Sequence, residues 1–235
     1  ATQTGNAPAV QGGIDYGHGS GFYIGAWLSN VNFGDSVETT TEQVVDDAGD
    51  PILDEDNKPQ FKTTSEYSSG SEYELDTYIG WGGDLTENVA LDVGYVYYHY
   101  GLSGSGGDFG ELYGNVGLWW FDVGVYYTTN SQIDTDYEAF DEGDIAYYLG
   151  FSIDLAESWS LGLTVGQYDF TNDGNRDLDG EKVDLSYGWG QIDLTKSAGR
   201  FGDFTLSVSQ AGEEADGNDN PKVFVTWTKG WSQKS

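Results

Sequence analysis

Apolar residues alternate with polar or small residues in many segments of this chain. In segment 88–100, Val89, Leu91 and Val93 occupy every second position. Because successive side chains of a β-strand point to opposite faces, this period of two predicts a strand with one apolar face. The same period recurs in 9–17, 21–33, 71–83, 109–117, 119–128, 144–154, 158–169, 182–193, 203–210 and 222–231. We therefore expect eleven strands and almost no helix, with Val93 and Phe121 on the outward, apolar side.

The links between these segments alternate between short and long. Short links surround Gly19, Thr86, Leu118, Glu157 and Ala198. Longer and mostly acidic links cover about 34–70, 101–108, 129–143, 170–181 and 211–221. Transmembrane barrels show this alternation because their periplasmic turns are short and their extracellular loops are long.

The tryptophans follow the same division of the chain into two ends. Six of the eight lie near short links or near the end of the chain, namely Trp81, Trp119, Trp120, Trp159, Trp189 and Trp231. An aromatic girdle at one membrane interface has this distribution, whereas the core tryptophans of a soluble sandwich would be scattered.

Together these patterns predict an all-β fold, a transmembrane antiparallel up-and-down β-barrel of about 12 strands. Residues 1–235 are expected to form a single outer-membrane barrel domain with a long acidic extracellular loop at about 34–70. The first and last of the eleven segments both run toward the short-link side, and bacterial single-chain barrels have even strand numbers. We therefore expect one further N-terminal strand ahead of Ala1. In the alternative, a soluble sandwich, the apolar faces would lie in a dry interior between two sheets.

Composition narrows the classes of function. The 40 Asp and Glu residues against 9 Lys and Arg give a net charge of -31, which excludes nucleic acid as a partner. The chain has no cysteine, so disulfides, cysteine-ligated zinc and thiol chemistry are absent. A mean hydropathy of -0.48 fits a barrel, since only alternate residues of its strands face lipid. The expected partners are outer-membrane lipid, lipopolysaccharide and small solutes, and the oligomeric state is left open.

Acidic residues fall on the side of the predicted strands opposite the apolar one. They are Asp15, Glu72, Glu74, Asp76, Asp92, Glu111, Asp122, Asp154 and Asp184. All nine basic residues lie in loops or near strand ends. The predicted lumen is therefore acidic, which would attract cations and repel anions. The alternative is a packed, non-conducting lumen in which some carboxyl groups are protonated or hydrogen-bonded to Tyr and Ser.

One acidic loop carries part of a calcium-binding pattern. Asp173, Asn175 and Asp177 match the first three positions of such a loop, and Asp179 follows them. Leu178 stands where the pattern requires glycine, and no Glu occupies the twelfth position. We expect no other cofactor, and the alternative for this segment is a plain solvated loop.

Catalysis finds little support in the sequence. The chain has two histidines, and a serine–histidine–acid triad would have to use one of them. We expect His18 to cap a turn and His99 to lie in an outer aromatic belt among Tyr97, Tyr98 and Tyr100. The protein is therefore predicted not to be an enzyme.

A resemblance to a known family emerges at Pro8–Phe33, where the string is PAVQGGIDYGHGSGFYIGAWLSNVNF. This stretch resembles the Gcw_chp family of proteobacterial outer-membrane proteins of unknown function. The strings DFGELYG at 108–114 and VGQYDF at 165–170 are similar to weaker motifs of the same family. The resemblance implies an outer-membrane barrel with a further strand ahead of the first motif, and it implies no settled substrate.

Three functions follow from the sequence. The first is a narrow channel or binding barrel for small cationic or polar solutes. The second is a structural or surface-interaction barrel whose acidic loops bind divalent cations, lipopolysaccharide or partner cells. The third is a filament-forming β-protein that recruits a neighbour by strand addition. Conductance in a planar bilayer distinguishes the first from the second.

Overall fold

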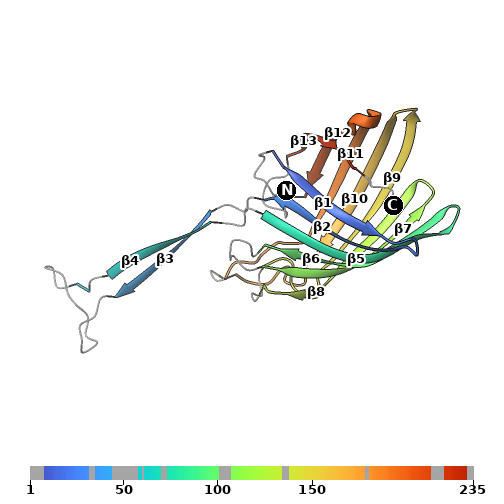
Figure 1. The fold of residues 1–235 in the computed structure, drawn as a ribbon. Helices are drawn as coiled ribbons and strands as arrows, with labels where there is room; N and C mark the ends of the chain where they lie inside the picture. The colour runs from blue at the N-terminus through green and yellow to red at the C-terminus, as the bar shows by residue number, and fades with distance from the viewer. Residues whose placement is uncertain are drawn as a thin grey trace.

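The structure, a computed structural model, describes residues 8–31, 35–43, 58–59, 61–69, 73–100, 107–133, 138–177, 180–212 and 220–231. Eleven of the described strands form one antiparallel sheet, drawn in Figure 1 as a curled surface. They are β1 (Gln11–Gly17), β2 (Phe22–Asn30), β5 (Tyr73–Thr86), β6 (Val89–His99), β7 (Phe109–Leu118), β8 (Phe121–Ser131), β9 (Ile145–Ala156), β10 (Trp159–Asp169), β11 (Tyr187–Ser197), β12 (Asp203–Ala211) and β13 (Lys222–Thr228). The eleven-stranded antiparallel architecture predicted from the alternation is confirmed.

The order of strands in the large sheet follows the chain, with β1 at one edge and β13 at the other. The link at about 34–70, expected to be a loop, contains two further strands. β3 (Asp35–Gln43) and β4 (Phe61–Ser69) pair with each other in a second, two-stranded sheet. A short 3-10 helix, η2 (Gly199–Phe201), lies in the link between β11 and β12. No helix in the described part of the chain is long and apolar enough to cross a lipid bilayer.

The two faces of the large sheet differ in character. Val93, Leu112 and Val165 are 40%, 54% and 57% exposed, although they lie in the middle of hydrogen-bonded strands. Glu111 and Thr128, which lie on the opposite face, are 7% and 1% exposed. A water-soluble protein has the reverse arrangement, with apolar side chains buried and carboxylates exposed. Val93 and Phe121 are exposed as predicted, so the sandwich alternative, which requires them in a dry interior, is wrong.

The sheet curls toward its polar face. Phe109 of β7 and Tyr168 of β10 both contact the ring of Phe140, with centroid distances of 4.7 and 6.3 Å. Two strands, β8 and β9, separate β7 from β10 in the sheet, so rings on these strands meet a common side chain only if the polar face is concave. We call the polar face the inner face and the apolar face the outer face.

Tryptophans gather at the short-link end of the sheet. Trp119 and Trp120 form the turn between β7 and β8, and Trp81 donates its indole N–H to the Ser20 carbonyl at 2.9 Å. Trp227 likewise donates to the Phe201 carbonyl in the β11–β12 link at 2.8 Å. The prediction for Trp189 is wrong, because this residue lies near the long-link end of β11.

Inner-face rings lie directly over glycines of neighbouring strands. A Cβ atom built on Gly166 would approach Cε2 of Trp189 to 2.6 Å, which is closer than real side-chain contacts. Gly94 and Gly124 are covered in the same way by Tyr113 and Tyr148. Glycine at these positions therefore lets a large ring pack flat against the backbone of the next strand.

Adding a methyl group at Gly166 should destabilise the fold. Gly166→Ala forces the Trp189 ring to move, and overpacking of this kind costs about 1–3 kcal/mol of unfolding free energy. Urea unfolding in detergent or lipid measures the loss. Gly162→Ala is the matched control on the same strand and face, since its Cβ would meet Asp193 Cβ at an ordinary 3.5 Å. Equal stability of the two variants would contradict the ring-over-glycine packing.

Candidate functional site

A network of phenols, amides and carboxylates crosses the middle of the inner face. The Tyr23 hydroxyl of β2 donates to Asp92 Oδ1 of β6 at 2.5 Å. The Asn115 amide of β7 lies 3.5 Å from Asp92 Oδ2, and the Tyr148 hydroxyl of β9 donates to Asn115 Oδ1 at 3.2 Å. Tyr23 also hydrogen-bonds with the Tyr113 hydroxyl. These contacts hold Asp92 as a fixed acceptor on the inner face.

Glycines allow this network to span strands that are not neighbours. β5 lies between β2 and β6, and the register places its Gly80 opposite Tyr23 and its Gly82 opposite Asp92. Since neither glycine has a side chain, the Tyr23 phenol reaches across β5 to the Asp92 carboxylate. The sequence separation of these two residues is 69.

A second group of carboxylates lies nearer the long-link end. The Thr128 hydroxyl lies 3.5 Å from Glu111 Oε1, and the Ser29 hydroxyl lies 3.5 Å from Glu74 Oε1. Asp76, two residues along β5 from Glu74, has a buried oxygen, Oδ1, for which the described residues provide no hydrogen-bond partner. Burying carboxylates together in this way is costly unless a counter-charge or a proton is supplied.

Basic side chains do not neutralise the inner carboxylates. Within the residues that the structure describes, Asp76, Asp92, Glu111 and Asp122 form no ion pair with a lysine or arginine. Lys196, although it lies within β11, hydrogen-bonds to the Ser158 hydroxyl and lies 5.0 Å above the Trp159 ring. The carboxyl groups in the middle of the described inner face therefore have no lysine or arginine partner among the described residues.

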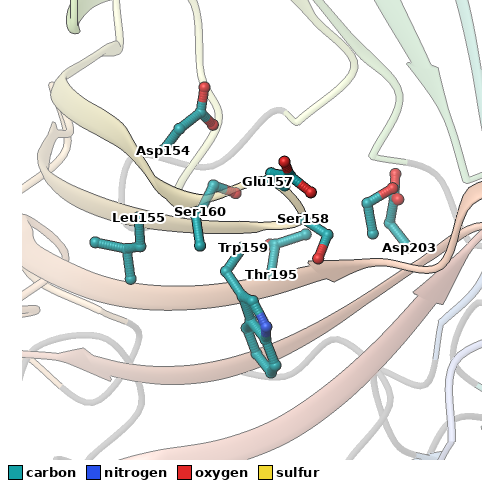
Figure 2. Close-up of a pocket in the computed structure, with 10 residues that line it drawn as sticks. Asp154, Leu155, Glu157, Ser158, Trp159, Ser160, Thr195 and Asp203 are labelled. Carbon is teal, nitrogen blue, oxygen red and sulfur yellow. The ribbon is translucent and has the colours of Figure 1, made fainter.

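The short-link end of the sheet carries a cavity of about 510 Å³. It is formed by the β9–β10 turn together with the end of β11 and the start of β12, and its lining includes the acidic residues Asp154, Glu157 and Asp203 (Figure 2). Ser158, Ser160 and Thr195 supply hydroxyl groups to the same lining. This end of the molecule thus offers another acidic, hydrogen-bonding surface.

The strand register places most of the acidic residues singled out from the sequence on one face. Asp15, Glu74, Asp76, Asp92, Glu111, Asp122 and Asp154 share the inner face. Asp15 accepts a hydrogen bond from the Tyr78 hydroxyl, and Asp122 lies against Gly150. Glu72 lies outside the described residues.

The expectation for Asp184 is wrong. β11 begins at Tyr187 and not at residue 182, so Asp184 is exposed in the loop before the strand. Within β11 the odd-numbered positions face inward, and they bring Gln191 and Asp193 to the inner face. Asp193 Oδ1 accepts hydrogen bonds from Ser207 Oγ at 2.6 Å and from Gln191 Nε2 at 3.0 Å. Gln191 and Asp193 already lay within the predicted segment 182–193, and their alternation with Ile192 and Leu194 is the signal that could have revealed this face.

The calcium-like residues make contacts within their own loop. Asp173 Oδ1 accepts the backbone N–H groups of Leu185 and Ser186, at 2.7 and 3.3 Å. Asp177 Oδ1 accepts the Glu181 N–H at 2.9 Å, and the Asn175 amide lies 3.4 Å from Asn172 Oδ1. Asp179 lies outside the described residues. Among those described, no three His, Asp or Glu side chains converge as a metal site would require.

The histidines occupy structural positions. His18 Nδ1 lies 2.7 Å from Ser20 Oγ and accepts the Ser20 N–H at 3.3 Å, as a turn cap. His99 Nδ1 lies 3.0 Å from Asp108 Oδ2, and its ring contacts Tyr97 at 4.5 Å. Both residues therefore lie where the sequence placed them, in a turn and beside aromatic residues.

Removing the hydroxyl of Tyr23 should weaken the central network. Tyr23→Phe leaves Asp92 without its closest donor, and a partly buried carboxylate that loses a hydrogen bond costs about 1–3 kcal/mol of unfolding free energy. Tyr127→Phe is the control, since Tyr127 is exposed on the outer face. Urea unfolding of both variants in the same detergent measures the difference. A Tyr23→Phe protein as stable as the control would show that this hydrogen bond contributes nothing.

Comparison with known proteins adds a family and a fold. A search of curated protein sequences gives no match to this chain. Among solved structures, the chain is similar to one titled "KdgM porin", with a TM-score of 0.50 and 6% identity over 86% of this chain and 84% of that one. A structure titled "NanC porin structure in rhombohedral crystal form" aligns with a TM-score of 0.49 and 10% identity, over 95% of this chain and 100% of that one. The likeness to the first shows an antiparallel β-barrel fold.

The family model described as "Bacterial protein of unknown function (Gcw_chp)" matches residues 1–218. The match includes the motif at Pro8–Phe33 and extends through β12. The chain belongs to the Gcw_chp family of bacterial proteins.

Proposed function

We propose that this protein spans the bacterial outer membrane as a narrow porin-like channel or binding barrel for small cationic or polar solutes. The observation that carries the proposal is the division between its two faces. Apolar side chains such as Leu112 and Val165 are exposed outward, whereas Asp92 and Glu111 lie inward. Lipid is the surrounding that suits such an outer face, and water-filled barrels place their polar residues on the inner one.

The membrane assignment draws on three observations. The outer face of the sheet is apolar along β6–β13, and tryptophans gather at the short-link end, where an aromatic girdle would meet an interface. The fold is also that of a protein named as a porin. Outer-membrane lipid and lipopolysaccharide are then the surroundings of the outer face.

The preference for cations draws on the charges of the inner face. Asp76, Asp92, Glu111 and Asp122 have no ion pair with a described lysine or arginine. In a narrow barrel with low-dielectric walls, such carboxylates produce a negative potential that concentrates cations and excludes anions. Phenol and amide groups along the same face would supply hydrogen bonds to polar solutes.

A second candidate is a structural or surface-interaction barrel that binds divalent cations or partners through acidic loops. The observation that favours it is close packing at the long-link end, where Phe109 stacks on Phe140 and Tyr168 stacks on Phe170. A lumen filled in this way would conduct poorly. The two candidates differ in whether purified protein carries ionic current.

Planar-bilayer recording tests the channel. We expect discrete conductance and a reversal potential in a salt gradient that indicates cation preference. Removing one inner charge in Asp122→Asn should lower the cation-to-anion permeability ratio by about twofold or more. Glu87→Gln, which removes a charge from the exposed β5–β6 turn, is the matched control. Anion preference in the unmodified protein would contradict the acidic-lumen proposal.

An arginine on the outer face tests the membrane assignment. Leu149 is exposed in the middle of β9, so Leu149→Arg would place a charge in hydrocarbon and lower stability in lipid by about 2–4 kcal/mol. Ser152→Arg, on the inner face of the same strand, should cost much less. Refolding into vesicles measures both variants. If both variants lost the same amount of stability, the outer face would be in contact with water and the membrane assignment would be wrong.

A further inference from the structure

A short segment between β8 and β9, residues 138–144, folds onto the inner face. The ring of Phe140 stacks on Phe109 of β7, with centroids 4.7 Å apart and an interplanar angle of 15°. It also makes edge contacts with Phe170 at 5.5 Å and with Tyr168 of β10 at 6.3 Å. Phe140 therefore lies inside the curl of the sheet and connects two of its strands. We call residues 138–144 the inward segment.

One buried carboxylate holds the inward segment in place. Asp144 is 3% exposed, and its Oδ1 accepts hydrogen bonds from both the backbone N–H and the hydroxyl of Thr171, each at 2.7 Å. Its Oδ2 accepts the Asp141 N–H at 2.9 Å. The backbone adds a pair of bonds, from Thr128 N–H to the Asp144 carbonyl and from Gly143 N–H to the Thr128 carbonyl, both 2.9 Å. The segment is thus anchored to β8 and to the link after β10.

A second anchor comes from the same link. The buried Asn172 donates its side-chain amide to the Glu138 carbonyl at 3.1 Å and to Asp141 Oδ2 at 3.3 Å. Phe140 itself has a φ of 65°, in the left-handed region that a bulky residue rarely adopts. Such a conformation persists only where surrounding contacts over-determine it, and here the ring contacts and both anchors do so.

The inward segment lies next to the carboxylates of the proposed channel. Thr128 connects the two, because its backbone bonds to Asp144 while its hydroxyl lies 3.5 Å from Glu111. On the other side, Tyr98 contacts Phe109 at 4.6 Å and hydrogen-bonds with Glu111. Aromatic rings and a carboxylate therefore share one level of the inner face, close to the long-link end.

We propose that the inward segment is the constriction of the barrel and that Phe140 determines which solutes pass it. Ring faces next to a carboxylate suit small ammonium-bearing organic cations, which interact with both. The ring contacts also limit size, because Phe140 occupies space between β7 and β10. This inference rests on the proposed channel function and adds to it a named residue and a solute class.

Truncation of the ring tests the constriction. In planar bilayers, Phe140→Ala should raise single-channel conductance at least twofold, reduce the preference for methylammonium over sodium, and keep cation preference over anions. Phe140→Tyr should behave as the unmodified protein. Phe121→Ala removes the same ring from the outer face and should leave conductance unchanged. Unchanged conductance in Phe140→Ala, beside a conducting unmodified protein, would overturn the constriction and leave the channel standing.

A labelling experiment decides the placement without relying on current. The chain has no cysteine, so Phe140→Cys introduces a single thiol. In protein folded into vesicles, a small maleimide should react with this thiol while a maleimide carrying a long polyethylene glycol reacts at least tenfold more slowly. Glu142→Cys, at an exposed position of the same segment, should react with both reagents. Equal rates at the two positions would overturn the inward placement.

The two experiments separate the two proposals. If the unmodified protein carries no current but Phe140→Ala does, the segment closes the barrel, and the open-channel function is wrong. If neither carries current and Phe140→Cys excludes the large reagent, the channel function fails while the placement of the segment stands.

Discussion

Every side chain in the large sheet is assigned to one of two faces by the hydrogen-bonded register between neighbouring strands. Because the side-chain period is two, a shift of one residue would exchange the faces of a whole strand. The register that places Val93 outward opposite Gly114 also places Asp92 inward opposite Asn115. The apolar outer face and the acidic inner face are therefore two consequences of one pairing pattern, and neither can change without the other.

The inner face is stabilised by groups that satisfy one another. The rings of Tyr113, Tyr148 and Trp189 lie over glycines of adjacent strands. They fill the space that a side chain at each glycine position would need. The Tyr148 hydroxyl then reaches the Asn115 amide, and the Tyr23 hydroxyl reaches the Asp92 carboxylate, each two strands away. Such a network both orders the inner face and fixes the directions in which its carboxylates point. The packing of the inner face thus fixes the positions of the carboxylates and phenols on which the proposed channel depends.

Buried polar groups also hydrogen-bond to one another at the long-link end. Asp144 and Asn172 are buried polar residues: Asp144 joins the inward segment to Thr171, and Asn172 donates its side-chain amide to the Glu138 carbonyl of that segment. Their hydrogen bonds hold Phe140 among Phe109, Tyr168 and Phe170. A constriction made in this way depends on fixed backbone contacts, so solute selection would not require a moving part.

The sequence by itself determined the eleven strands of the large sheet and most of their faces, but not the pair β3 and β4. Alternation of apolar and polar residues is a local signal, and eleven segments carried enough of it to identify the sheet and the exposed positions of Val93 and Phe121. The faces of Asp92, Glu111 and Asp122 follow from the same signal. The alternation signal failed at β11. Apolar and polar residues already alternate in the loop before Tyr187, so Asp184 was predicted to lie on a strand.

Only the tertiary structure decided which inner residues meet. Tyr23 and Asp92 are 69 residues apart, and their contact requires two glycines on an intervening strand. The inward position of Phe140 depends on Asp144 and Asn172 bonding across two links, for which no periodic pattern exists. Strand periodicity predicts the face on which a side chain lies but not the residues that it contacts, because those contacts depend on register, sheet curvature and the path of the loops.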